Sequence, residues 1–543
     1  MIAVLRPLKD SGIATIWSGL AASTIGEDLF RVAVVWIAAE QIGNAAGYVN
    51  AAQYGAMLVI GLIGFGGYRV HDANPVHRQA LEEALRAGIN LIDTSSNYGD
   101  GGSERLIGEV IARLCEDGVI AREQVVVVTK IGYVQGAALE EARRRSPPYP
   151  EVVEYLDECW HCIHPEYLAD QLEACRARLG LARIDVLLLH NPEYLLIDRR
   201  NRRGQIDEVD RDLLLRRIGA AFRFLERAVA DGLIGCYGVS SNTFVAPEGA
   251  GEHLALDRVL EVAREVGGED HHFAVVEMPM NLYEGGALRE RATTAAGPKS
   301  ALEVAEGADL GVLVNRPLNA FVEEPEPRMI RLADVERGAR PQDPAPLLRA
   351  VQALEAAWAG GLGRELAQTS GDPRYADLFR WGRELESGLG SIRDLGHWIR
   401  LRNGVIATHM GQLGGILLST LEGDALARFR SFWEDYGGTL QAALDGIEDG
   451  FRGRAQALVD RISERLDVAL PAGVRGLGLA QKAVLTLLAA PVSCVLVGMR
   501  EPAYVHEMVQ LAPWIAALDA EGDERVVLDP AAVLAIFAPT AIH

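Results

Sequence analysis

Basic residues are scarce in this chain, and none of their clusters forms a stripe that could follow a row of phosphates. The 543 residues include 53 Lys and Arg against 75 Asp and Glu, which gives a formal net charge of −22. Proteins that bind nucleic acid or an acidic membrane surface normally present a basic patch. We therefore expect neither of these among the partners.

Cysteine is also sparse, and its spacing forms no disulfide framework. The six cysteines are scattered over the chain: Cys115, Cys159, Cys162, Cys175, Cys236 and Cys494. This pattern suits a reducing compartment and predicts a cytoplasmic protein. The cluster Cys159, Cys162 and His164 lacks the second ligand pair of a structural zinc site, so no metal is expected. His164 is better explained as the residue before Pro165 at a helix start.

The residues that are abundant indicate a large folded core. Hydrophobic residues make up 49% and charged residues 24% of the chain, a globular composition. From residue 63, short apolar runs alternate with amphipathic stretches, which is typical of βα units and a parallel sheet. Eight runs are predicted as strands: Ile63–Tyr68, Ile89–Thr94, Gln124–Lys130, Ile184–His190, Ile234–Ser240, Phe273–Met278, Leu310–Asn315 and Ser493–Gly498. Eight strands with intervening helices predict a closed (β/α)8 TIM barrel.

Helices are predicted between the strands, and two insertions interrupt the alternation. The predicted helices are His77–Ala87, Glu104–Glu116, Pro165–Leu179, Leu213–Ala230, Leu256–Val266, Lys299–Glu306 and Leu477–Ala490. A smaller insertion covers about 135–163. A larger one, mostly helical by its periodicity, covers 320–475, and its Trp and Leu stripes are interpreted as a helical core. The predicted domains are therefore an N-terminal hydrophobic helical segment (1–58), the barrel (59–319 and 476–543) and the helical insertion (320–475).

Four chemically complementary side chains stand at or just after three successive strand ends. Asp93 and Tyr98 follow the second strand, Lys130 ends the third, and His190 ends the fourth. In parallel barrels the carboxyl ends of the strands form the active-site face. An ammonium near a phenol lowers the pKa of the phenol, a carboxylate fixes the ammonium, and an imidazole orients a substrate oxygen. This set therefore predicts a site for proton transfer to or from a substrate oxygen.

The motifs around these residues resemble those of the aldo-keto reductase family. The stretches "DTSSNYGDGGSERLIG", "VVVVTK" and "IDVLLLHNPE" are similar to its three signatures in order, and the resemblance extends over about residues 60–515 around the insertion. It implies a catalytic tetrad of Asp93, Tyr98, Lys130 and His190, with Tyr98 as general acid and base. It also implies hydride transfer between a nicotinamide cofactor and a small carbonyl or alcohol substrate. NADP(H) is the expected cofactor, with NAD(H) as the alternative.

The same resemblance implies where the cofactor binds. The matching positions follow strands one, five, six, seven and eight: Gly66, Gly67, Tyr68, Ser240, Ser241, Asn242, Glu277, Arg316, Pro317, Leu318, Gly498 and Arg500. Two positions depart from the family pattern. Glu277 stands where the family usually has Gln beside the nicotinamide carboxamide, and Met280 replaces a common aromatic. A carboxylate at this place would favour the cationic oxidised ring over the neutral reduced one.

Residues 1–60 do not match the start of this family. They resemble instead the first transmembrane helix of major facilitator superfamily transporters, through Arg6-Pro7-Leu8, Trp17-Ser18-Gly19 and "LFRVAVVW". The dozen spans of a transporter do not fit the chain, and Glu27, Asp28 and Arg31 interrupt the first span. A fusion remnant or a misplaced gene start is the preferred interpretation, and a membrane tether is the second. The rival functions are thus a non-catalytic cofactor-binding redox sensor or partner-binding barrel, and a membrane-tethered protein.

Overall fold

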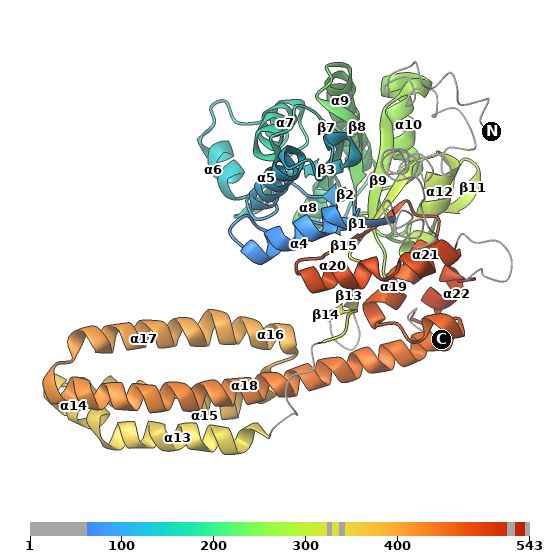
Figure 1. The fold of residues 1–543 in the computed structure, drawn as a ribbon. Helices are drawn as coiled ribbons and strands as arrows, with labels where there is room; N and C mark the ends of the chain where they lie inside the picture. Colours follow the sequence, from blue (N-terminus) through green and yellow to red (C-terminus); the bar gives the residue numbers. More distant parts are fainter. Residues whose placement is uncertain (1–61, 323–327, 336–342, 519–526, 538–543) are drawn as a thin grey trace. The chain divides into compact units, whose positions relative to one another are not determined.

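The structure is a computed structural model that describes residues 62–322, 328–335, 343–518 and 527–537 (Figure 1). The predicted N-terminal segment, 1–58, lies outside the described residues. The chain divides into two compact units, one drawn from residues 1–332 and 466–543 and the other from 333–465.

The first unit contains a closed barrel of eight strands in the order β1-β15-β12-β9-β8-β7-β3-β2. Every neighbouring pair is parallel. The strands are β1 (Ile63–Gly66), β2 (Leu91–Asp93), β3 (Val126–Ile131), β7 (Ile184–His190), β8 (Ile234–Ser240), β9 (Phe273–Pro279), β12 (Gly311–Asn315) and β15 (Cys494–Val497). The predicted TIM barrel is confirmed, and all eight predicted strands are present with ends shifted by a few residues.

Apolar side chains from the strands fill the barrel interior. One cluster joins strands from around the barrel and includes Leu91, Val128, Leu188, Val275, Leu313 and Leu496. Branched aliphatic residues at alternating strand positions give such a packed interior, so the barrel is a core and not a pore. A site must therefore form at a barrel end, where the loops lie.

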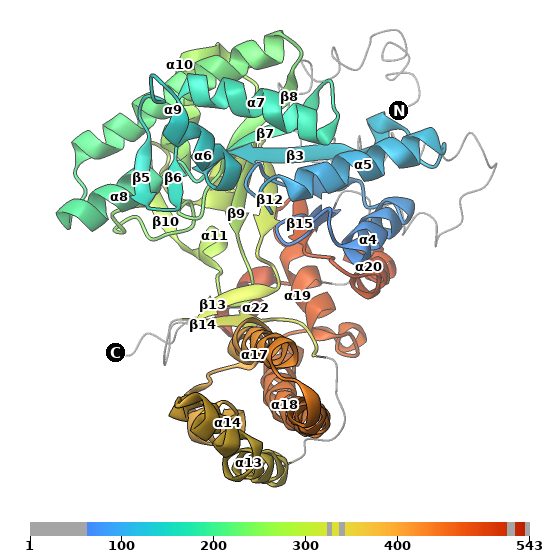
Figure 2. The same ribbon diagram turned by 90° about the vertical axis from the view of Figure 1, so that its left-hand side faces the viewer.

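Helices cover the outside of the barrel, as Figure 2 shows for α4, α5, α7 and α10. The main helices are α4 (Pro75–Arg86), α5 (Gly102–Glu116), α7 (Pro165–Leu179), α8 (Tyr194–Arg203), α9 (Glu208–Ala230), α10 (Leu256–Gly267), α12 (Ala301–Gly307), α19 (Leu479–Leu488), α20 (Pro502–Val509), α21 (Ala512–Leu518) and α22 (Pro530–Ala535). Their starts follow ordinary capping chemistry. His164 is the N-cap of α7, where its Nδ1 accepts from the Glu166 N–H at 3.3 Å, as predicted.

The predicted helix Lys299–Glu306 starts two residues late. Residues Gly297–Ser300 form β11, which pairs with β10 (Arg291–Thr294) in an antiparallel hairpin. Ser300 then caps α12 by accepting from the Glu303 N–H, while the Glu303 carboxylate accepts from the Ser300 N–H. This capping box fixes the change from strand to helix at Ser300.

The smaller insertion adds a helix and a small sheet. It contains α6 (Gly136–Arg144), and β5 (Val153–Leu156) and β6 (Cys159–His161) join β4 (Tyr133–Val134) in a three-stranded antiparallel sheet. The larger segment begins with a second hairpin, β13 (Asn319–Val322) and β14 (Arg328–Arg331), which belongs to the first unit. The start of the segment predicted as mostly helical is therefore a β-hairpin.

The second unit is helical and has its own core. Its helices are α13 (Pro344–Gly360), α14 (Leu362–Ser370), α15 (Trp381–Gly388), α16 (Leu395–Arg400) and α17 (Ala407–Thr420), with most of α18 (Gly423–Asp467). Trp358, Trp398 and Phe429 are buried in one apolar cluster that joins these helices. The prediction that the Trp and Leu stripes form a helical core is confirmed.

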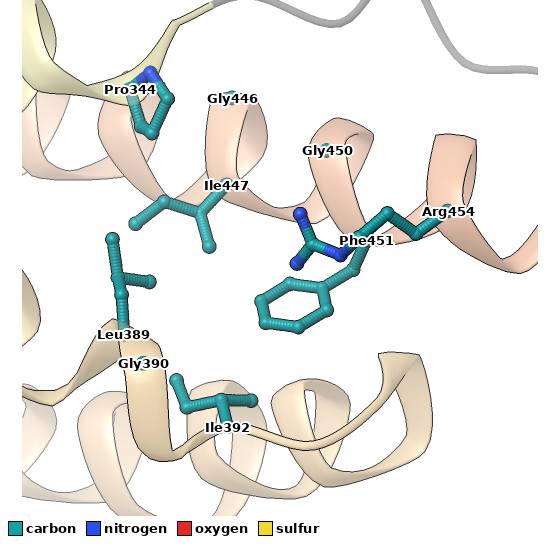
Figure 3. A pocket seen from close by; sticks show the side chains of 9 residues that line it. All are labelled: Pro344, Leu389, Gly390, Ile392, Gly446, Ile447, Gly450, Phe451 and Arg454. Atoms are coloured by element: carbon teal, nitrogen blue, oxygen red, sulfur yellow. The ribbon is translucent and has the colours of Figure 1, made fainter.

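A cavity of about 390 Å³ lies within this helical unit (Figure 3). Its walls are mostly apolar, from Leu389, Ile392, Ile447 and Phe451. The Arg454 guanidinium lies over the Phe451 ring at 4.2 Å from its centroid. None of the predicted site residues lines this cavity, so the chemistry has to be sought in the barrel.

No helix in the described parts of the chain combines the length and the apolarity that crossing a lipid bilayer requires.

Candidate active site

The four predicted catalytic residues meet at one end of the barrel. Asp93 is the last residue of β2, Lys130 lies next to the last residue of β3, and His190 is the last residue of β7. Tyr98 lies in the turn between β2 and α5. Because these three strands are neighbours in the parallel barrel, their carboxyl ends bring the four side chains together.

Lys130 is the centre of this group and is completely buried. Its ammonium forms an ion pair with Asp93 and donates to the Thr94 carbonyl at 3.2 Å. It also donates to the Tyr98 hydroxyl at 3.5 Å and lies 5.2 Å from the centroid of that ring. The predicted contacts of the lysine with the carboxylate and the phenol are therefore both present.

Burial and charge shift the pKa values of these groups. Burial lowers the pKa of Lys130, but the carboxylates of Asp93 and Glu277 outweigh it, and the net pKa is raised. Burial raises the pKa of Tyr98, the Lys130 ammonium lowers it, and the two carboxylates raise it further, so that the net pKa is raised. Lys130 is thus charged and Tyr98 protonated in the cofactor-free protein at neutral pH.

His190 is uncharged in this environment. Burial and the nearby Lys130 ammonium hold its pKa well below the usual value. Its Nδ1 is 3.0 Å from the Ser95 hydroxyl, and its ring meets the Tyr98 ring edge to face at 6.0 Å. A neutral imidazole oriented through Nδ1 leaves the other ring nitrogen for a substrate oxygen.

Gly67 brings the loop after β1 against this site. Its N–H donates to the Asp93 carbonyl at 2.8 Å, and a Cβ at this position would lie 2.5 Å from that oxygen and 2.8 Å from Ser103 Oγ. Only glycine allows this approach. Of its predicted neighbours in the cofactor set, Gly66 is half-buried and Tyr68 is 65% exposed, with its ring 5.1 Å from that of Tyr98.

Glu277 points inward from β9 and contacts Lys130. Its Oε2 is 3.1 Å from the Lys130 ammonium, and its Oε1 accepts from Ser240 Oγ at 3.1 Å and Asn315 Nδ2 at 2.8 Å. Glu277 is only 1% exposed. Lys130 therefore has two carboxylate partners, of which the sequence predicted one.

The remaining predicted cofactor residues lie on the loops after β8, β12 and β15. Ser241 is buried and Asn242 is exposed, with its N–H donating to Glu193 Oε1 at 3.0 Å. Arg316 adopts the left-handed region (φ 55°) and donates to Glu284 at 3.0 Å, and it is followed by buried Pro317 and half-buried Leu318. Gly498 has nothing within 4 Å of an added Cβ. Arg500 has no ion-pair partner among the described residues.

The structure adds three residues around His190 that the sequence reasoning did not single out. Tyr133 packs edge to face on the His190 ring at 4.7 Å, and its hydroxyl accepts from Asn191 Nδ2 at 2.8 Å. Burial raises the pKa of Glu193 to about 7, against hydrogen bonds that lower it. Asn191 and Glu193 come one and three residues after His190, and Tyr133 comes three residues after Lys130. Their nearness to strand ends was thus the available signal.

Part of the barrel is similar to a known protein family. Residues 57–259 match the model of the aldo/keto reductase family. The matched stretch contains β1, β2, β3, β7 and β8 of the barrel and ends within α10. Asp93, Tyr98, Lys130 and His190 all lie within the matched residues, in agreement with the sequence resemblance.

Individual relatives match shorter parts of this chain. An NADH-specific methylglyoxal reductase of Escherichia coli (strain K12) is 34% identical over 20% of this chain and 28% of its own length. A D-threo-aldose 1-dehydrogenase of a Pseudomonas species is 30% identical over 34% of this chain and 49% of its own length. The chain thus matches between about a quarter and a half of the length of these relatives.

Solved structures of aldo-keto reductases resemble the chain at low identity. One from Bacillus halodurans, in its holo form, is 14% identical, with a TM-score of 0.41 and 89% and 93% of the two chains covered. One from Klebsiella pneumoniae, in complex with NADP and acetate, is 22% identical, with a TM-score of 0.27 over 47% of this chain and 64% of its own.

Proposed function

We propose that this protein is an NADP(H)-dependent aldo-keto reductase that transfers a hydride between the nicotinamide and a small carbonyl or alcohol substrate. The observation that carries the proposal is the buried Lys130 ammonium, which contacts both the Asp93 carboxylate and the Tyr98 hydroxyl at the carboxyl ends of the barrel strands. A phenol held against a fixed ammonium is a proton donor whose phenolate is stabilised as it forms.

Each residue of the tetrad has one role in this proposal. Tyr98 donates its proton to the carbonyl oxygen of the substrate during reduction and takes a proton back from an alcohol during oxidation. Lys130 stabilises the phenolate, and Asp93 holds Lys130 in place. His190, neutral and oriented by Ser95, hydrogen-bonds the substrate oxygen and aligns it with Tyr98. When bound, the nicotinamide cofactor supplies or accepts the hydride.

The proposed cofactor residues suit a dinucleotide with an extra phosphate. Arg500 follows β15 and has no ion pair within the described ranges, and its charge acts on His77 of α4. A free guanidinium near the last strand of a barrel suits a phosphate group. Gly498, two residues before Arg500, has open space around its Cα. Asn315 has a buried Oδ1 without a hydrogen-bond partner, and this oxygen could accept a hydrogen bond from the NH2 group of the nicotinamide carboxamide.

The test is a panel of small carbonyl compounds assayed by NADPH and NADH absorbance. The panel contains methylglyoxal, D-xylose and other aldoses, because similar proteins are named for these compounds. We expect turnover with at least one carbonyl, faster with NADPH, and its loss in Tyr98→Phe. Cofactor binding without any turnover would instead support a non-catalytic redox sensor.

A further inference from the structure

Lys130 is held between two buried carboxylates that come from different sides of the barrel. Asp93 reaches it from β2 and Glu277 from β9, with Glu277 Oε2 at 3.1 Å. All three side chains are at most 6% exposed. The Tyr98 hydroxyl faces the same ammonium at 3.5 Å. One buried cation therefore contacts two acids and a phenol.

Neighbouring strands fix Glu277 in this orientation. Ser240 of β8 lies opposite Glu277 in the sheet register, and Asn315 is the last residue of β12 on the other side. Both donate to Oε1, at 3.1 Å and 2.8 Å, which leaves Oε2 directed at Lys130. These two hydrogen bonds therefore hold the carboxylate beside the Lys130 ammonium, which lies 3.1 Å from Oε2.

A second carboxylate changes the charge that Tyr98 experiences. Lys130 and Asp93 alone form a neutral pair whose ammonium end faces the phenol. Burial raises the pKa of Asp93 to about 8, the Lys130 ammonium lowers it, and Glu277 raises it further. Above that pH, with Glu277 also ionised, the cluster carries a net charge of −1, and a buried negative charge near a phenol opposes the formation of phenolate. The same negative charge favours a cation bound close by.

We propose that Glu277 is a positioning residue that acts through Lys130, because its carboxylate offsets the ammonium that stabilises a Tyr98 phenolate and so biases the site toward carbonyl reduction. The inference rests on the proposed function. In reduction, the Tyr98 O–H bond breaks as a hydride from the reduced nicotinamide reaches the carbonyl carbon, and the carbonyl oxygen takes the proton. Alcohol oxidation needs the phenolate to be present beforehand, and Glu277 disfavours it.

Other ionisable groups face the cluster from each neighbouring element. They are Asp93 from β2, His190 from β7, Cys494 from β15 and the Tyr68 ring from the loop after β1. Burial raises the pKa of Cys494, which keeps it neutral, and His190 is neutral as well. Asp93 and Glu277 are therefore the two groups whose negative charge sets the titration of Tyr98.

The experiment measures the titration of Tyr98 directly in the full-length, cofactor-free protein. Tyrosine labelled with 13C at Cζ is followed by NMR as the pH is raised, and the Tyr98 signal is assigned by its absence in Tyr98→Phe. We expect Glu277→Gln, which keeps the shape and removes the charge, to lower the pH of Tyr98 titration by at least about one unit. Glu277→Asp should retain most of the wild-type behaviour because it keeps the charge.

Ser240→Ala is the matched control, since it removes a hydrogen bond from the same carboxylate but leaves the ion pair intact. It should not lower the pH of Tyr98 titration. Equal titration in the wild type and Glu277→Gln, including no titration in either up to the pH at which they unfold, would overturn the inference. If Glu277→Gln fails to fold, Glu277→Met replaces it in the same comparison.

The pH dependence of turnover provides the second measurement. In Glu277→Gln, kcat/KM for alcohol oxidation should rise at a pH about one unit lower than in the wild type, and the ratio of oxidation to reduction at pH 7 should increase about tenfold. A lowered Tyr98 titration in a protein without turnover would reject the reductase function and leave the electrostatic role standing. If Glu277→Gln turns over substrate but Tyr98 titrates at the same pH as in the wild type, the role inferred for Glu277 is rejected and the reductase function stands.

Discussion

The barrel and the helical unit each bury a glutamate, but they neutralise it in different ways. Glu277 of the barrel contacts a fully buried lysine that is shared with a second acid. Glu355 of the helical unit, 3% exposed, accepts from the Gly382 N–H at 2.6 Å and the Tyr436 hydroxyl at 3.2 Å. Its ion-pair partner, Arg383, is 58% exposed at 3.5 Å.

Glu355 is a buried acid that holds helices together, whereas Glu277 is a buried acid beside groups that can exchange protons. In the helical unit, neutral donors from α15 and α18 both donate to Oε1 of the α13 carboxylate and fix the three helices to one another, while Oε2 faces the exposed Arg383. In the barrel, the buried cation has more acid neighbours than it can neutralise, and a titratable phenol stands beside it. Shared, incompletely balanced charge of this kind is typical of sites where protons move.

The largest effect expected concerns Tyr98. Tyr98→Phe keeps the ring and its contact with Tyr68 but removes the hydroxyl that lies beside the Lys130 ammonium. We expect kcat/KM for carbonyl reduction to fall about 10³-fold, the range of a lost general acid. The cofactor Kd, measured by fluorescence, should stay within about twofold. Retained turnover would assign the acid role to another group.

Removal of Lys130 should damage stability as well as activity. Lys130→Met leaves Asp93 and Glu277 buried without a cation, and breaking a buried ion pair costs about 3–5 kcal/mol of the free energy of unfolding. The double variant Lys130→Met/Glu277→Gln should recover part of this loss, because one of the two unpaired charges is gone. Urea unfolding of the three proteins measures it. Equal stabilities of the single and double variants would show that Glu277 and Lys130 are not coupled.

Glu193 predicts a pH dependence of stability. Burial raises its pKa to about 7 from an ordinary value of 4.5. A carboxyl with a raised folded-state pKa stabilises the fold fully below pH 4.5, and this contribution is lost as the pH rises toward 7. The shift corresponds to about 3 kcal/mol. We expect the stability difference between pH 4.5 and pH 7.5, from urea unfolding, to shrink by about this amount in Glu193→Gln. An unchanged difference would place the titration elsewhere.

A smaller effect is expected from Glu355 and its donors. Tyr436→Phe removes one neutral donor while the Gly382 N–H stays, so we expect a loss of about 1–2 kcal/mol in the free energy of unfolding. Turnover by the barrel should be unaffected, as the substitution lies in the other unit. Arg383→Ala, which removes the exposed partner of Glu355 together with an exposed ion pair to Asp377, is the control and should cost less than about 1 kcal/mol. A larger cost for Arg383→Ala would contradict the contrast between the two glutamates.

The sequence predicted the barrel well because its signals are local. Eight apolar runs separated by amphipathic helices define the strands, and a residue's position at a strand end defines its place at the barrel mouth, as for Asp93 and His190. The hairpins β10–β11 and β13–β14 were missed because their strands are only four residues long and mix polar with apolar residues. Ser300 is both the last residue of β11 and the N-cap of α12, and hydrophobic periodicity does not reveal this double role.

Contacts between side chains on opposite sides of the barrel could not be predicted from the sequence. Glu277 is recognisable as a departure from the family pattern, but its partner depends on the distance between β9 and β3, which are not neighbours in the sheet. The orientation of Glu277 also depends on Ser240 and Asn315, each more than 30 residues away in the chain. The sequence therefore located the carboxylate at the site and left open which group it would meet.

The smallest predicted effect concerns the choice between the two forms of the cofactor. A carboxylate beside the proposed nicotinamide position should favour the cationic oxidised ring, but Lys130 lies 3.1 Å from Glu277 and offsets much of that charge. The residual preference is therefore expected near about 1 kcal/mol, or roughly fivefold in Kd, and not at the several kcal/mol of an unpaired charge. Glu277→Gln should weaken NADP⁺ by about that factor and leave NADPH nearly unchanged. Both dissociation constants are measured by fluorescence at pH 7 in the wild type and the variant. Equal changes would mean that the ring does not sense the second carboxylate, so that the effect of Glu277 is confined to Lys130 and Tyr98. A much larger change for NADP⁺ would mean that Glu277 leaves Lys130 and turns to the ring when the cofactor binds.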